Sequence, residues 1–174
     1  DWRGVSAAIQ EFVTESPVPV FVKEVGHGIS ASSAAILVDL GVSWIDVAGA
    51  GGTSWSQIEH IRGGREGVSA FANWGVTTKE AIESIRDKGL PCMLVGSGGL
   101  RSGLDAAKVV RIGADIAAAA QPFLEPARTS VQQTIKVIES WEKDFKITMF
   151  STGSKNLDEL RTAKLLNERD RIEG

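Results

Sequence analysis

Residues 91–113 read PCMLVGSGGLRSGLDAAKVVRIG and contain, in order, an apolar segment, a glycine-rich loop and an amphipathic segment. The apolar segment 91–95 has the length and composition of a buried strand. Ser102 with Asp105 three residues later is typical of a helix start, and Gly113 is typical of a residue that ends a helix. This stretch therefore predicts a strand followed by a helix, the repeating pattern from which parallel sheets are built.

The same pattern recurs along the chain. Strands are expected at residues 18–25, 44–48, 91–95 and, more weakly because of its alanines, 115–120. Helices are expected over 5–12, from Ser30 to Gly41, from the Thr77–Glu80 capping box to Gly89, from Ser102 to Gly113, over 131–145 and from Asn156. The order α-βα-βα-βα-βα-α, with one longer connection over 52–77, predicts an α/β domain over 1–174 with a parallel sheet buried on both faces.

Composition narrows the possible functions. Nineteen Lys and Arg against 22 Asp and Glu leave no basic excess to bind nucleic acid or anionic lipid. The apolar runs are shorter than the roughly 18 residues of a membrane span. Cys92 is the only cysteine, and His27 and His60 lie outside any zinc-ligand spacing. We expect a cytoplasmic protein, no metal site in this chain and a core position for Cys92. Because the chain opens at Asp1 rather than at a methionine, we also expect it to continue a longer sequence.

Two glycine-rich loops follow strand candidates. Residues 96–101 (GSGGLR) lead into the helix that Ser102 caps, and residues 48–54 (AGAGGTS) follow the second strand. Such loops expose backbone N–H groups, so they can bind an anion, with Arg101 as a counter-charge; a plain turn is the alternative for either loop alone. If the third and fourth strands are the seventh and eighth of a barrel, loop 96–101 and the turn 120–122 lie where barrels bind phosphate.

Lys23 lies at the carboxyl end of the first strand, where barrel active sites gather. It is either a cation directed at a cofactor, or an ion-pair partner of Glu24 or Asp46, or a surface lysine. Alternation along the strand places Lys23 and Glu24 on opposite faces. Trp55 and Trp74 could border a flat ligand, although packing across a helix layer is the expected role of Trp74.

Four segments, in the same order, resemble those of one family. Residues 22–30 (VKEVGHGIS) are similar to its VKEVGxGIS segment, 46–55 (DVAGAGGTSW) to DVAGxGGTSW, 97–108 (SGGLRSGLDAAK) to SGGIRSGLDxAK, and 149–154 (MFSTGS) to its MFLTG ending. The likeness covers nearly the whole chain. On these motifs the sequence resembles type 2 isopentenyl-diphosphate delta-isomerase.

The resemblance implies a (β/α)8 barrel that binds FMN, with this chain as its C-terminal half: strands five to eight and extra C-terminal helices. Such enzymes interconvert isopentenyl and dimethylallyl diphosphate in isoprenoid biosynthesis, with NADPH as the usual reductant and Mg²⁺ on the diphosphate, and they commonly form tetramers or octamers. The resemblance places Lys23 near the flavin N1/O2 edge and Thr53 against FMN, and it assigns the phosphate cradle to Gly99, Leu100, Arg101, Ala120 and Gln121.

The chain also departs from the family pattern, because the motifs of the family's N-terminal half are missing from it. We therefore expect the catalytic residues and the Mg²⁺ ligand to lie outside this chain. One alternative is a half-barrel fragment or phosphate-binding module without activity. Another is a different FMN-dependent barrel oxidoreductase. However, hydroxy-acid oxidases place a histidine where this chain has Ala50-Gly51-Gly52, and inosine-monophosphate dehydrogenases carry a catalytic cysteine in a glycine loop, whereas Cys92 lies in a predicted strand.

Overall fold

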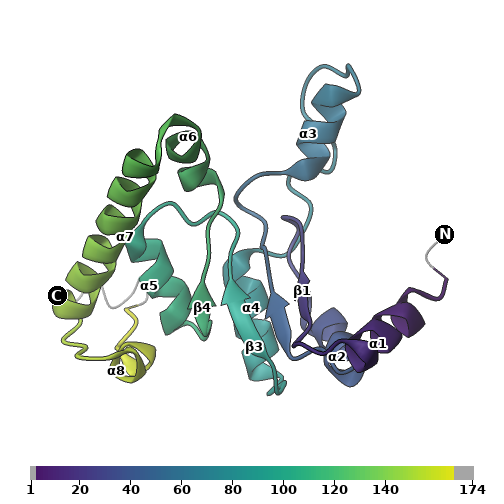
Figure 1. Ribbon diagram of the computed structural model, residues 1–174, viewed down its shortest axis with the longest axis horizontal. Helices are drawn as coiled ribbons and strands as arrows, with labels where there is room; N and C mark the ends of the chain where they lie inside the picture. The colour runs from purple at the N-terminus through teal and green to yellow at the C-terminus, as the bar shows by residue number, and fades with distance from the viewer. Residues whose placement is uncertain (1–2, 167–174) are drawn as a thin grey trace.

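The computed structural model describes residues 3–166 and is built around a four-stranded parallel sheet (Figure 1). Its strands are β1 (Phe21–Lys23), β2 (Trp44–Asp46), β3 (Met93–Gly96) and β4 (Ile116–Ala117), and they lie side by side in the order β1-β2-β3-β4. The predicted α/β class and parallel sheet are confirmed. The strands are shorter than the apolar runs in the sequence, because the run ends leave the sheet to form loops.

Eight helices occur among the described residues. They are α1 (Val5–Glu15), α2 (Ala31–Asp39), α3 (Trp55–Arg62), α4 (Thr78–Asp87), α5 (Gly103–Arg111), α6 (Gln121–Thr129), α7 (Val131–Ser151) and α8 (Leu157–Thr162). The predicted caps are present: the side chains of Ser30, Thr77, Ser102 and Asn156 each accept the backbone N–H three residues ahead. The capping residues in the sequence therefore predicted these helix starts correctly.

Helices α1 and α7 extend past their expected ends at residues 12 and 145, and two further helices were not among those expected. The connection 52–77 contains α3, which the sequence did not reveal, because this helix buries no residue and so carries no apolar periodicity. In Figure 1, α3 stands away from the sheet. Residues 120–122 were interpreted as a short turn, but Gln121 and Pro122 already form the first turn of α6.

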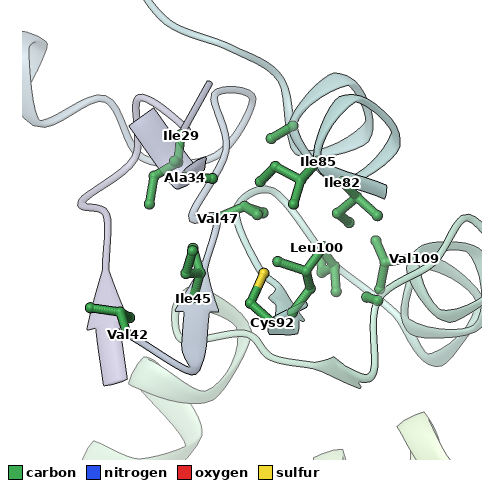
Figure 2. Packing of buried hydrophobic residues seen from close by; sticks show 13 residues of the cluster. Ile29, Ala34, Val42, Ile45, Val47, Ile82, Ile85, Cys92, Leu100 and Val109 are labelled. Carbon is green, nitrogen blue, oxygen red and sulfur yellow. The ribbon is translucent and has the colours of Figure 1, made fainter. Parts of the chain in front are cut away.

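The core lies on one face of the sheet. Val22, Ile45 and Leu94 are aligned across β1, β2 and β3, and they pack with residues of the covering helices such as Ile82 and Ile85 of α4. Figure 2 shows the side chains of this cluster converging between strands and helices. The cluster holds the sheet against α2, α4 and α5, and so fixes where the loops beyond the strands begin.

The expectation that both faces of the sheet are buried was wrong. Phe21 of β1 and Met93 of β3, which lie on the face opposite the core, are 46% and 40% exposed. Helices cover only one face of a barrel sheet, and the opposite face is filled by side chains from the other strands around the barrel. Four strands cannot close such a barrel, so this face stays open among the described residues.

Candidate functional site

All the residues singled out in the sequence as cofactor contacts lie at or beyond the same edge of the sheet. Because the strands are parallel, their carboxyl ends share one edge, and each following loop starts there (Figure 1). Lys23 ends β1 and Thr53 lies in the loop after β2; Gly99, Leu100 and Arg101 follow β3; Ala120 and Gln121 follow β4. The topology thus brings the seven predicted residues to one edge, which is where α/β folds bind ligands.

The glycine loops after β2 and β3 contact each other through their backbones. A Cβ atom on Gly98 would lie 2.2 Å from the carbonyl oxygen of Gly49. A Cβ on Gly49 would lie 2.1 Å from the backbone nitrogen of Thr78, at the start of α4. These approaches are possible only without side chains, so the glycines are required for the two loops to interlock.

The loop after β3 presents backbone donors that the chain does not use. Within residues 3–166, the N–H groups of Gly98, Gly99 and Leu100 donate to no protein acceptor. A Cβ on Gly52 would lie 2.6 Å from the nitrogen of Gly99, so the glycine at position 52 keeps that amide uncovered. The φ angles of Gly98 and Gly99 are +100° and +78°. Unpaired N–H groups in such a turn are suited to bind an anion such as phosphate.

The start of α5 adds positive potential beside these donors. Arg101 is exposed and, in the described part of the chain, its guanidinium makes no ion pair. Its backbone N–H donates to Asp105 Oδ2 at 3.1 Å, which anchors the loop to the helix. Partial burial acts to raise the pKa of Asp105, but hydrogen bonds from the Arg101 N–H, Lys108 and Ser102 outweigh it and leave the pKa below its usual value.

Lys23 forms one of the ion pairs considered from the sequence. Its Nζ lies 3.5 Å from Asp46 Oδ2 and donates to the Glu24 carbonyl oxygen at 2.9 Å. The Lys23 side chain is 55% exposed, so its ammonium group also faces solvent. Asp46 is buried, and its Oδ1 accepts hydrogen bonds from Ser97 Oγ at 2.5 Å and Ala48 N at 3.1 Å. Asp46 therefore ties together the ends of β1, β2 and β3.

Asp46, Ser97 and Thr78 were not identified as site residues from the sequence. The available signal for Asp46 was an acidic residue at the end of a buried strand, which is a costly place for an unpaired charge. Thr78 follows the predicted cap Thr77, and its hydroxyl lies within hydrogen-bonding distance of two carbonyls in the loop after β3. No local pattern could have indicated that contact.

The loop after β1 is held by its own side chain. Glu24 Oε2 accepts the backbone N–H groups of Gly26 at 2.7 Å, His27 at 2.6 Å and Gly28 at 3.1 Å. A carboxylate therefore already occupies the anion position of this turn. The role of His27 in the structure is through its backbone, because its carbonyl accepts the N–H of Val76 at 2.7 Å.

The remaining sequence candidates lie outside this cluster of loops or at its margin. Trp74 is 67% exposed and stacks edge-to-face on Phe71, so the expectation that it packs across a helix layer was wrong. Trp55 opens α3 with 46% of its surface exposed. Cys92 is buried in the core as predicted, and burial raises the pKa of its thiol.

Across residues 3–166 there is no cluster of His, Cys, Asp and Glu suited to a metal ion, and no helix long and apolar enough to cross a membrane.

Comparison with curated proteins confirms the resemblance seen in the motifs. The chain is 44% identical over 170 residues to the isopentenyl-diphosphate delta-isomerase of Stutzerimonas stutzeri, covering 95% of this chain and 49% of that protein. It is 42% identical over 174 residues to the isopentenyl-diphosphate delta-isomerase of Pseudescherichia vulneris, covering 98% of this chain and 50% of that protein. The chain thus spans about half the length of the curated relatives it matches.

Solved structures confirm the fold class. A protein from Pediococcus acidilactici described as a lactate oxidase superposes with a TM-score of 0.71 at 21% identity, over 93% of this chain and 40% of that one. A mandelate oxidase bound to (S)-4-hydroxymandelic acid gives 0.69 at 19% identity, over 91% and 40%. The four-stranded sheet and its helices are therefore part of a (β/α)8 barrel. Residues 4–167 match the family described as FMN-dependent dehydrogenase, and the chain belongs to that family.

Proposed function

We propose that the protein carrying this chain catalyses the FMN-dependent isomerisation of isopentenyl diphosphate to dimethylallyl diphosphate in isoprenoid biosynthesis. The identity of 44% to a relative of that name supports the reaction. The observation that carries the role of this chain is the loop after β3, where the N–H groups of Gly98, Gly99 and Leu100 are unpaired within the described residues. This chain would supply the phosphate site of FMN.

The residues at the carboxyl edge fit the parts of FMN. The phosphate would be held by Gly99, Leu100 and Arg101, with Ala120 and Gln121 at the N-terminus of α6, whose dipole favours an anion. Thr53 would contact the cofactor from the loop after β2. Lys23 would lie at the N1/O2 edge, where a cation stabilises the anionic reduced ring. When bound, reduced FMN would supply the electron-rich ring that takes part in proton transfer at the substrate double bond.

The rest of the active site would come from outside this chain. We propose that residues 1–174 form one domain and half of the barrel, and that the other half covers Phe21 and Met93 on the open face. That half would provide the catalytic residues and the Mg²⁺ ligand for the diphosphate. NADPH would reduce the flavin, and the complete protein would be a cytoplasmic homo-oligomer, a tetramer or an octamer.

Turnover tests this proposal directly. The protein made from its complete reading frame is assayed with isopentenyl diphosphate, FMN, NADPH and Mg²⁺, and formation of dimethylallyl diphosphate is expected. Residues 1–174 alone are assayed in parallel, and no turnover is expected from them. Oxidation of a 2-hydroxy acid in place of isomerisation would favour the oxidoreductase alternative, and activity of residues 1–174 alone would refute the argument that the site is incomplete.

The phosphate assignment has a separate test. In the complete protein, Arg101→Ala combined with Thr53→Ala is expected to weaken FMN binding by at least about tenfold, because a charge-assisted contact to the phosphate is lost. Arg128→Ala is the matched control, since Arg128 is another exposed arginine, near the end of α6 and paired with Glu125. Titration of flavin fluorescence measures both dissociation constants. Unchanged affinity in the double variant would count against the cradle.

A further inference from the structure

We propose that Thr78 is a positioning residue that presets the phosphate donors of the loop after β3, although it contacts no ligand itself. This inference rests on the proposed FMN site. Thr78 is the first residue of α4 and is 7% exposed. Its Oγ1 lies 2.9 Å from the carbonyl oxygen of Ser97 and 2.7 Å from that of Gly98. The single O–H of Thr78 is therefore shared between the carbonyl oxygens of two consecutive peptide groups.

Holding these carbonyls determines where the adjacent N–H groups point. The described peptides are all trans, and in a trans peptide the C=O and N–H bonds point in opposite directions. The Ser97 carbonyl shares its peptide with the Gly98 N–H, and the Gly98 carbonyl shares its peptide with the Gly99 N–H. By drawing both carbonyls toward α4, Thr78 directs both N–H groups away from α4.

These are the same N–H groups that have no acceptor within residues 3–166. Gly98 has no other described donor to its carbonyl, whereas the Ser97 carbonyl also accepts the Gly49 N–H at 2.9 Å. The Thr78 hydroxyl therefore has more influence on the orientation of the Gly98–Gly99 peptide than on the orientation of the Ser97–Gly98 peptide. Preset donors bind an anion without first having to rotate, which raises affinity.

Other contacts keep α4 in place without this hydroxyl. The Thr77–Glu80 capping box closes the start of the helix, and Ala81, Ile82 and Ile85 are fully buried in the core. Removal of the Thr78 hydroxyl is therefore expected to leave the fold intact while freeing the glycine loop. A role in positioning the loop then predicts an effect limited to the phosphate end of the cofactor.

The test compares FMN with riboflavin, which lacks the phosphate, on the protein made from its complete reading frame. The wild type is expected to bind FMN more tightly. In Thr78→Val, the ratio of the riboflavin dissociation constant to the FMN dissociation constant is expected to fall about tenfold, with riboflavin affinity unchanged. The reason is that loss of one preset donor weakens only the phosphate contact. Thr78→Ser, which keeps a hydroxyl, should retain the preference. Thr148→Val is the matched control, because Thr148 Oγ1 bonds within α7 to Asp144.

The outcomes separate this inference from the cofactor proposal. Equal preferences in Thr78→Val and wild type, or equal weakening of both ligands, would overturn the role of Thr78 and leave the FMN site standing. A wild type that does not prefer FMN over riboflavin would overturn the phosphate site and this inference with it. If Thr78→Val does not fold, as judged by circular dichroism, Thr78→Ala is measured in the same way and decides the question.

Discussion

Two glycine-containing turns at the carboxyl edge of the sheet have different partners for their N–H groups. In the turn after β1, Glu24 Oε2 accepts three consecutive N–H groups, those of Gly26, His27 and Gly28. In the turn after β3, three consecutive N–H groups, those of Gly98, Gly99 and Leu100, have no acceptor within residues 3–166. The first turn is closed by a carboxylate of the chain itself, whereas the second remains open.

The difference separates a turn that the chain closes itself from the turn that we propose binds phosphate. A buried or half-buried N–H without an acceptor costs stability unless water or a ligand satisfies it. In the first turn the side chain supplies that acceptor. In the second turn, the first acidic residue is Asp105, and its carboxylate binds the N–H of Arg101, beyond the three open donors. A glycine-rich sequence thus indicates a turn with several donors, and the neighbouring acids decide whether a ligand can use them.

Among changes to these two turns, removal of the Glu24 carboxylate is expected to have the largest effect on stability. Glu24→Ala leaves the partly buried N–H groups of Gly26 and His27 unpaired, whereas the Gly28 N–H still donates to the Ala48 carbonyl oxygen at 3.2 Å. We expect the free energy of unfolding to fall by about 2 to 3 kcal/mol. Chemical denaturation measures the loss. Glu59→Ala is the control, because Glu59 makes only an exposed pair with Arg62 and should cost less than about 0.5 kcal/mol. Equal losses would show that Glu24 does not hold the turn.

Covering the open turn is expected to have a smaller effect on stability and a larger one on binding. Gly52→Ala places a methyl group 2.6 Å from the Gly99 nitrogen, so the loops must separate slightly, at about 1 to 2 kcal/mol. FMN affinity should fall by at least about tenfold, since the methyl covers a phosphate donor. Gly63→Ala, at a backbone φ of −73°, is the control. Normal FMN affinity in Gly52→Ala would mean that Gly99 N–H is not a donor.

The smallest effect concerns the acid beside the open turn. The pKa of Asp105 is lowered in the folded protein, so its contribution to stability is present above the usual aspartate value of 3.8 and is lost as pH falls through the lowered pKa. Asp105→Asn should therefore be less stable at pH 7 by about 1 kcal/mol, and the difference should shrink below pH 3.8. Thermal unfolding across pH measures this. A difference that is constant with pH would exclude the charge of Asp105 as its origin.

Much of the local structure could be predicted because local chemistry determines it. The helix starts at Ser30, Thr77, Ser102 and Asn156 follow from side chains that bond N–H groups three residues away. Helix α3 was missed because it packs no apolar face into the core. The burial of the sheet was predicted for both faces from its near-continuous apolar runs, but Phe21 is 46% exposed, because such a run cannot say which part of the protein supplies the second layer.

The sequence by itself determined the order of the four strands, the helices other than α3 and α6, the two glycine loops and the edge of the sheet at which they meet. Only the tertiary structure decided which donors stay open. The Thr78 hydroxyl lies 19 residues before Ser97 in sequence, and Ser97 Oγ bonds an Asp46 that lies 51 residues before it. A donor is free or satisfied according to the groups that surround it in space, and packing of the core brings those groups together from distant parts of the chain.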